Sequence, residues 1–376
     1  MSEPQKLPSQ LREVFNKTVV SSLSSRIQGV YPQFKHLDFC DEIIPKLDDL
    51  NFGDRIQLIK RALKTHLPDH FPTSAQILID SLGPEIIEVE LSGDYGFYIM
   101  PVSGYIAEWG LDPQHYRLSM EALKEMTKRF TCEFAVRSFI TAFPKETLEI
   151  FKIWAVDKNC HIRRLVSEGT RPRLPLAGRL PEFQKDPTPV LELLELLKND
   201  PILLVRRSVA NNLNDIGKDN PKAVVETLKQ WQTENTKSMD WLIAHATRSL
   251  VKTGDKGTLQ LLGFSDQAQI SDLKFEILTP EVTLGNSLEI SIKFTSDTTQ
   301  KLVIDYAIHF LKANGKQKPK VFKWSVKKLK PEARVNLQKK ITLKQLSTRT
   351  LYSGQHRVEI LINGDSSITK GFTLNF

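Results

Sequence analysis

The sequence is poor in cysteine. Its three cysteines, in 376 residues, are Cys40, Cys132 and Cys160. They are odd in number and far apart, so they cannot build a disulfide framework or a CxxC zinc site, and this usage is typical of a reducing compartment. Two histidines, His66 and His70, stand four residues apart, but Pro68 between them should break the helix that would align them. We therefore predict no metal site and no cofactor.

Long apolar runs are missing as well. No run of about 18 apolar residues occurs, so no segment is predicted to span a membrane. Residues 1–6 contain no apolar region of the secretory type. Glycine and proline, at 18 and 20 residues, are too few for collagen-like or low-complexity chains. We expect a cytoplasmic protein of two or three ordinary domains, without a membrane partner.

Basic residues are concentrated in the last third of the chain. Residues 268–376 contain 18 Lys or Arg against 9 Asp or Glu, a net charge of +9, while the whole chain carries +8. The first 267 residues are therefore close to neutral. The excess is densest from Lys312 to Lys344, and it predicts contact with a polyanion.

The periodicity of the sequence changes near the same place. Up to about residue 264 apolar residues recur at helical spacing, and Asp200-Pro201 should begin a helix that Gly217 ends. After residue 271 the period becomes two, with turn signals such as Asn314-Gly315. We predict strands at 272–278, 287–296, 300–312, 319–329, 333–343, 354–363 and 367–376. Seven short strands in this span predict an immunoglobulin-like antiparallel β-sandwich.

The helical part has an approximate repeat. Residues 205–210 (VRRSVA) are similar to the second-helix signature of HEAT repeats, and Arg-bearing helices of the same kind are predicted at 134–139, 161–166 and 241–250. Outer helices are predicted at 145–156, 188–198 and 222–230. Arg164, Arg207 and Arg248 are spaced 43 and 41 residues apart, which are HEAT-like periods. We thus predict a helical-repeat superhelix at 1–266, lined on its concave face by the inner helices, and the β-sandwich at 267–376.

Each predicted inner helix carries a polar stripe at intervals of three or four residues. Such residues share one helix face, so each stripe points in one direction. The four stripes are Arg129, Glu133 and Arg137; Arg164 and Glu168; Arg207, Asn211 and Asp215; and Trp241, His245, Arg248 and Lys252. If the helices stack as repeats, the stripes meet on the concave surface. Arg and Lys would then surround three carboxylates, Glu133, Glu168 and Asp215.

A purely structural explanation of these stripes stays open. Arg–Glu pairs at this spacing are common on solvated helices, and HEAT repeats often carry Asp and Arg in hydrogen-bond ladders between repeats. Four stripes in register favour a binding face.

The segment 167–175, Ser-Glu-Gly-Thr-Arg-Pro-Arg-Leu-Pro, is unusual for a connector because it combines two prolines with two arginines. Together with RFTCEFAVR at 129–137, RRSVANNLND at 206–215, HATRSLVK at 245–252 and LLGF at 261–264, it resembles the AlkC-type DNA alkylation repair glycosylases. The resemblance spans roughly residues 10–265 and is specific from about 129 to 264. The basic β-domain is similar to the immunoglobulin-like module of one subgroup.

The resemblance implies a monofunctional DNA glycosylase that acts on double-stranded DNA with cationic N3-alkylated bases, 3-methyladenine and 3-methylcytosine, without base flipping. Carried over by motif, the catalytic carboxylates would be Glu133, Glu168 and Asp215. The residues expected to bind DNA are Arg129, Arg137, Arg164, Arg171, Arg173, Arg207, His245, Arg248 and Lys252. We also expect a monomer, associated with the nucleoid of a bacterial cell.

The expected chemistry needs both charge signs. A cationic base leaves without a strong general acid, and carboxylates can stabilise the oxocarbenium-like transition state and position a water. The same carboxylates repel phosphate, so basic residues must hold the DNA against them. We expect Glu168 to matter most, because it ends its helix beside the Arg171-Pro172-Arg173 corner.

The sequence departs from the family pattern at Leu176, where a tryptophan usually follows Arg-Pro-Arg-Leu-Pro. An aromatic ring there could stack on a charged lesion or form a cation–π contact with it, so the departure bears on lesion preference and rate. Two other interpretations stay open. The chain could be a non-catalytic HEAT-repeat protein that binds nucleic acid or serves as a scaffold, or it could be an RNA-directed factor.

Overall fold

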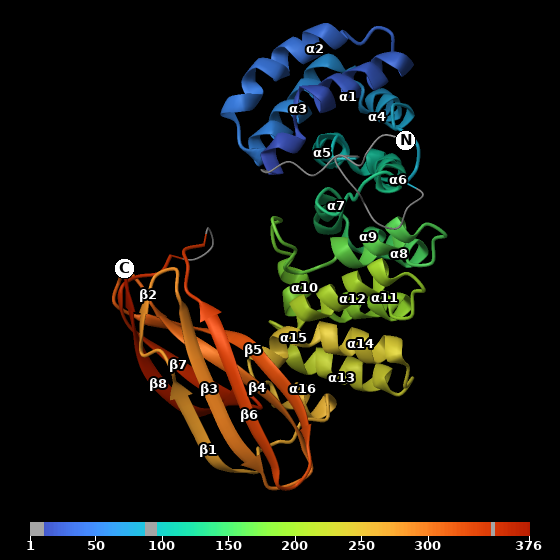
Figure 1. The fold of residues 1–376 in the computed structure, drawn as a ribbon. Coiled ribbons are helices and arrows are strands. Elements are labelled where there is room, and N and C mark those ends of the chain that lie inside the picture. The colour runs from blue at the N-terminus through green and yellow to red at the C-terminus, as the bar shows by residue number, and fades with distance from the viewer. Residues whose placement is uncertain (1–10, 87–95, 347–349) are drawn as a thin grey trace, which may run out of the picture. The chain divides into compact units, whose positions relative to one another are not determined.

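A computed structural model describes residues 11–86, 96–346 and 350–376. The chain divides into two compact units, residues 1–220 with 235–246, and residues 221–234 with 247–376 (Figure 1). The first unit is helical, and the second joins helices to two β-sheets. The predicted class, helical repeats followed by an immunoglobulin-like sandwich, is confirmed. None of the described helices is long and apolar enough to cross a membrane.

The first unit starts with helices that show no regular repeat. They are α1 (Lys17–Val30), α2 (His36–Ile43), α3 (Phe52–His66), α4 (Phe71–Asp80), α5 (Ile99–Trp109) and α6 (Tyr116–Thr127), with the 3₁₀ turns η1 (Leu11–Val14), η2 (Ile44–Asp49) and η3 (Pro113–His115). The helices that follow are α7 (Val136–Ala142), α8 (Pro144–Trp154), α9 (Cys160–Gly169), α10 (Pro181–Lys185), α11 (Thr188–Leu197), α12 (Leu203–Ile216) and α14 (Lys237–Ala246).

The inner helices of the repeats stack on one another. Helix α9 packs on α12, and α12 packs on α14, while α8 and α11 pack behind them as outer helices (Figure 1). Buried apolar residues recur three or four apart, such as Ile162, Leu165 and Val166 on α9, which gives each helix one apolar face. Asn159 is the N-cap of α9, and its side chain accepts a hydrogen bond from the amide N–H of His161 at 2.9 Å.

The start of α12 differs from the prediction. The helix begins at Leu203, so Asp200 and Pro201 form a turn before it and do not cap it. The carboxylate of Asp200 accepts the amide N–H of Ile202 and also binds Arg163, and these bonds stabilise the turn. The predicted end is confirmed, because α12 stops at Ile216 and Gly217 follows as its C-cap.

The second unit contains the sandwich. Its strands are β1 (Ile270–Ile277), β2 (Glu281–Thr283), β3 (Ser287–Ser296), β4 (Gln300–Leu311), β5 (Gln317–Leu329), β6 (Ala333–Thr342), β7 (Gly354–Ile362) and β8 (Asp365–Asn375). One sheet has the order β1-β3-β6 and the other β2-β8-β7-β4-β5. All pairs are antiparallel except β2 with β8; the three-residue β2 was not predicted. Alternate residues such as Ile304, Tyr306 and Ile308 face the apolar core.

Three helices belong to this second unit, α13 (Pro221–Gln232), α15 (Arg248–Lys252) and α16 (Lys256–Leu261). Leu259 and Phe264 pack on Val303 of β4. The side chain of Asn363 accepts from the amide of Val303 and donates to the carbonyl of Ser265, which ties the helical segment to the sheet. The domain boundary at 266/267 follows the change from helix to strand, and it stays a prediction.

Candidate functional site

Two buried carboxylates meet at the ends of two inner helices. Glu168 is the last residue but one of α9, and Asp215 is the last but one of α12. Arg171, in the turn after α9, lies between them. Its Nη1 donates to Oε1 of Glu168 at 2.6 Å, and its Nε donates to Oδ2 of Asp215 at 2.8 Å. Helix stacking therefore joins residues that are far apart in the chain.

The electrostatics of Arg171 follow from this position. Its side chain is buried, and burial by itself lowers the pKa of a guanidinium. The charges of Glu168 and Asp215 outweigh burial, so the pKa of Arg171 is raised above its ordinary value. Arg171 was predicted to bind DNA, but its charge is shared between these two carboxylates.

A second arginine extends the cluster to a third acid. Nη2 of Arg164 donates to Oε2 of Glu133 at 3.2 Å and lies 3.9 Å from Oε2 of Glu168. Glu133 also accepts from the hydroxyl of Thr131 at 2.8 Å. The five side chains form one series of ion pairs, which we call the carboxylate cluster. Its members in order are Glu133, Arg164, Glu168, Arg171 and Asp215.

Glu133 reaches the cluster from a turn, so the first predicted stripe is wrong. Helix α6 ends at Thr127 and α7 begins at Val136, which leaves Arg129 and Glu133 without a common helix face. Arg129 donates instead to Glu125 at 3.0 Å and to the carbonyl of Gly83 at 2.9 Å.

Two further arginines predicted to bind DNA are engaged within the protein. Arg137 is 6% exposed and donates to backbone carbonyls, and the little of it that is exposed borders a surface cavity. Burial, together with the charge of Arg171, lowers the pKa of Arg137 to about 10. Arg173 forms an ion pair with Asp219, with Nε to Oδ2 at 2.7 Å.

Hydroxyl groups behind the cluster were missed by the sequence reasoning. Ser208 of α12 donates to Oε2 of Glu168 at 2.6 Å, and Ser167 donates to the hydroxyl of Ser208 at 2.6 Å. Both serines are buried. Helical spacing could have identified Ser208 from the sequence, because it stands two turns before Asp215 on the same side of α12.

The remaining predicted residues separate into two groups. On α14, the rings of Trp241 and His245 are stacked with centroids 5.2 Å apart, and His245 forms a hydrogen bond with Asn211 of α12 at 3.2 Å. Arg207 is exposed on α12. The fourth stripe is interrupted, because α14 ends at Ala246; the predicted DNA contacts Arg248 and Lys252 lie on α15, in the second unit.

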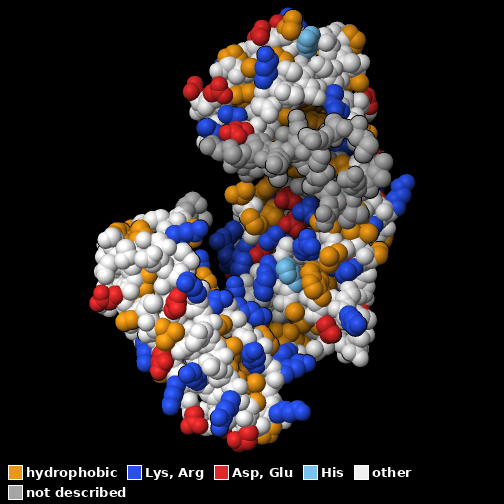
Figure 2. All heavy atoms as spheres, in the orientation of Figure 1, with side chains coloured by type: hydrophobic (Ala, Val, Ile, Leu, Met, Phe, Trp, Pro, Cys, Tyr) orange, Lys and Arg blue, Asp and Glu red, His pale blue; other side chains and the backbone are white. Residues whose placement is uncertain are grey.

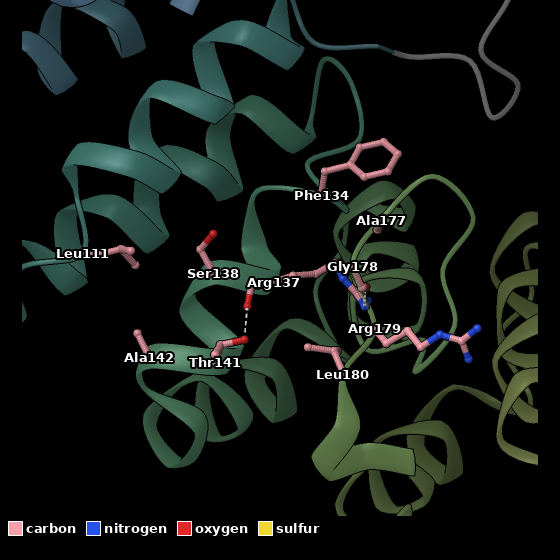
Figure 3. Close-up of a pocket in the computed structure, with 10 residues that line it drawn as sticks. All are labelled: Leu111, Phe134, Arg137, Ser138, Thr141, Ala142, Ala177, Gly178, Arg179 and Leu180. Atoms are coloured by element: carbon pink, nitrogen blue, oxygen red, sulfur yellow. Dashed lines mark hydrogen bonds between the residues drawn. The ribbon is translucent and has the colours of Figure 1, made fainter. Parts of the chain in front are cut away.

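A shallow cavity of about 520 Å³ lies between α7 and the loop after α9, near Phe134, Ser138 and Leu180 (Figure 3). Leu176 belongs to the same loop, is 85% exposed and has a φ of +63°. A branched or bulky residue with positive φ is strained, and such strain is often found at functional sites.

Charged side chains gather on both units. Figure 2 shows acidic and basic side chains side by side over the middle of the helical unit, and mainly basic ones over the strands. On β5, an edge strand of the five-stranded sheet, exposed lysines include Lys318, Lys320 and Lys328.

Comparison with known proteins covers nearly the whole chain. Residues 271–376 match the family described as the C-terminal Ig-like domain of the uncharacterised protein YhaZ. The uncharacterised protein YhaZ of Bacillus subtilis is 36% identical over 360 residues, with 94% of this chain and 96% of that one covered. The solved structure of the alkylpurine DNA glycosylase AlkC of Pseudomonas fluorescens, bound to DNA with an abasic-site analogue, matches with a TM-score of 0.87 and 33% identity, covering 98% of this chain and 100% of that one. The similarities to YhaZ and to AlkC each extend over the helical repeats and the sandwich. On these grounds the chain belongs to the AlkC family.

Proposed function

We propose that this protein is a DNA glycosylase that hydrolyses the N-glycosidic bond of cationic N3-alkylated bases in double-stranded DNA. The observation that carries the proposal is the carboxylate cluster, in which Glu133, Glu168 and Asp215 share two guanidinium groups. The family relation to an alkylpurine DNA glycosylase supports the same class of substrate.

The chemistry suits a leaving group that is already charged. A base alkylated at N3 carries a positive charge and departs without a strong general acid, and the sugar then develops oxocarbenium character. Preorganised carboxylates stabilise that charge and can hold the attacking water. Glu168 is the proposed principal catalytic residue, because Arg171 and Ser208 fix both of its oxygens. Such a mechanism works on a base that is not flipped out of the duplex, since it needs contact with the sugar and not with the base edge.

Cleavage would be by water alone. A glycosylase that also cuts the DNA backbone attacks the sugar with an amine nucleophile. Lys218 is paired with Asp215, with Nζ 2.7 Å from Oδ1, and an ammonium held by a carboxylate is a poor nucleophile. We therefore propose a monofunctional enzyme.

The test is release of free base from alkylated duplex DNA. We expect 3-methyladenine and 3-methylcytosine to be released with turnover, and the neutral bases uracil and hypoxanthine to stay in place, because neutral bases need acid assistance or a binding pocket. A scaffold or a non-catalytic binder would release no base. Efficient release of uracil would contradict the proposed mechanism.

The basic sheet unit is proposed to add phosphate contacts. Changing Lys318, Lys320 and Lys328 to glutamine in the full-length protein should weaken binding to any DNA sequence. Each lost phosphate contact should reduce the slope of log affinity against log salt by about 0.9. An unchanged affinity and an unchanged salt slope would show that this strand does not touch DNA.

A further inference from the structure

One buried arginine closes the loop that carries Arg171. Arg137 lies in the first turn of α7. Its Nη1 donates to the carbonyl of Gly169 at 3.0 Å and to the carbonyl of Arg171 at 2.7 Å, and its Nη2 donates to the carbonyl of Gly178. Figure 3 shows the guanidinium of Arg137 reaching Gly178 from α7.

The three carbonyls stand at the two ends of one loop, residues 170–180, which joins Gly169 at the end of α9 to the start of α10. Gly169 and Arg171 come before its tip and Gly178 comes after it, so a single guanidinium joins the ends. The two arms also meet directly, where the amide of Leu180 donates to the carbonyl of Pro172 at 3.2 Å. Arg137 therefore fixes the backbone on which the side chain of Arg171 is mounted.

Burying Arg137 under this loop is unfavourable for the free energy of folding, and a loop that only connects two helices would not need it. Arg137 is buried, and no carboxylate forms an ion pair with it in the part of the chain that the structure describes. Burying a cation that has no direct ion pair is unfavourable, even when carbonyls accept its hydrogen bonds. Burial lowers the pKa of Arg137 to about 10, so the charges of Glu133 and Asp215 do not offset this cost. The rigid fork of a guanidinium is, however, the group best suited to hold several acceptors in fixed positions.

We propose that Arg137 is a positioning residue of the carboxylate cluster. It holds the loop so that Arg171 stays between Glu168 and Asp215, and it does not itself contact DNA. The inference rests on the proposed function, because only a reaction at the cluster makes the exact placement of Arg171 important for rate.

The first experiment replaces the fork by a single ammonium. Arg137→Lys keeps the charge but cannot donate to three separate carbonyls in the same geometry. We expect the single-turnover rate on methylated DNA, at saturating enzyme, to fall about 100-fold, the loss typical of a catalytic group misplaced by about 1 Å. Affinity for DNA with an abasic-site analogue should be retained. Arg179→Lys is the matched control, since Arg179 is exposed beside Gly178, and its rate should match that of the wild type.

A second variant disturbs the same contact from the other side. A Cβ on Gly169 would lie 2.7 Å from Cγ1 of Val136, so Gly169→Ala should push the end of α9 away from α7 while Arg137 is intact. We expect the same kind of defect, with slower base release and retained DNA affinity. A normal rate in both variants would overturn the proposal.

Hydrogen exchange gives a readout that does not depend on activity. In Arg137→Lys the amides of Ala177 and Leu180 should exchange faster than in the wild type, with α7 and α9 still protected.

The possible outcomes separate the alternatives. If exchange is unchanged, Arg137 does not hold the loop. If exchange rises but the rate is normal, the loop is not needed for positioning. If DNA affinity falls as much as the rate, Arg137 binds DNA directly. A wild-type protein that releases no base would contradict the proposed function, and the exchange data would still decide whether Arg137 holds the loop.

Discussion

Two sets of ion pairs join α9 and the turn after it to α12 and the turn before it, and they differ in composition. At one place Arg163 binds Asp200, with Nη2 3.0 Å from Oδ1 and Nε on the other oxygen. At the other place Arg171 binds Asp215 but also Glu168. The first is one acid with one base, the unit expected of a ladder between repeats.

The second is a network, in which three carboxylates share the guanidinium groups of Arg164 and Arg171 and Asp215 also binds Lys218. The carboxylates of this network are held close together by the cations between them, whereas a single Arg–Asp pair brings only one acid to the helix contact. Closely spaced, interacting titratable groups are frequent at functional sites. The comparison therefore separates a structural Arg–Asp pair from a candidate site built on the same two helices, and each prediction below tests that distinction.

The largest expected effect is on catalysis. Glu168→Gln removes a charge with little change of shape, and we expect single-turnover base release to slow by about 100–1,000-fold while DNA binding survives. Asp200→Asn is the matched change at the structural pair, and it should lower the melting temperature and leave the rate near normal. Full activity of a stable Glu168→Gln protein would refute the catalytic assignment.

A third buried aspartate, in the sheet unit, extends the comparison to an acid that forms no ion pair with any residue that the structure describes. Asp305 is 3% exposed, and its Oδ1 has no hydrogen-bond partner among the described residues. Burial raises the pKa of Asp305 to about 6, although Lys323 and the amide of Trp324 oppose the change. The unfolded chain ionises this group at lower pH, so its penalty on folding is absent below about pH 4, grows between about pH 4 and pH 6, and is constant above that range.

Asp305→Asn should therefore stabilise the protein at pH 8, by up to about 2–3 kcal/mol, and should flatten the stability profile between about pH 4 and pH 6. Urea unfolding followed across this pH range measures both effects. Asp200, which is ion-paired, is the comparison: its asparagine variant should lose stability at pH 8. Equal destabilisation by both changes would show that Asp305 is stabilised as an anion.

A smaller effect is expected from the hydroxyl behind the cluster. Ser208→Ala removes the donor to Oε2 of Glu168, and a hydrogen bond to a charged group contributes about 1.5–3 kcal/mol, so base release should slow by about tenfold or more. Thr170→Val removes a buried hydroxyl between the same two helices that does not touch a carboxylate. That control should reduce melting temperature and spare the rate. Equal loss of rate in both variants would make Ser208 a structural residue.

The smallest expected effect is at the exposed tip of the loop. Leu176→Trp offers an aromatic face to a cationic base, and an exposed cation–π contact contributes about 0.5–1 kcal/mol. We expect release of 3-methyladenine to become a few-fold faster, with no gain on uncharged lesions. An unchanged rate for both lesion types would show that this side chain does not face the base.

Much of the fold was already determined by local sequence. Apolar spacing of three or four residues predicted α9, α11 and α12, and alternation with turn signals predicted seven of the described strands, because both patterns depend on the geometry of a single element. The three-residue β2 was missed because so short a strand carries no readable period. The ends of helices were predicted less accurately than the helices themselves. At α12, for example, Asp200 stabilises a turn through Arg163 and does not cap the helix.

The sequence alone also indicated that Glu168 and Asp215 lie on the same side of the stacked inner helices, since each stands on a polar stripe, although both are buried in the structure. Only the tertiary structure decided how they are held. Glu133 arrives from a turn, Arg171 lies between two acids, and Arg137 closes a loop from another helix. Such contacts join residues 31 to 44 positions apart. They depend on the offset with which one helix stacks on the next, and the packing of whole faces sets that offset, whereas sequence spacing reports only which residues share a face.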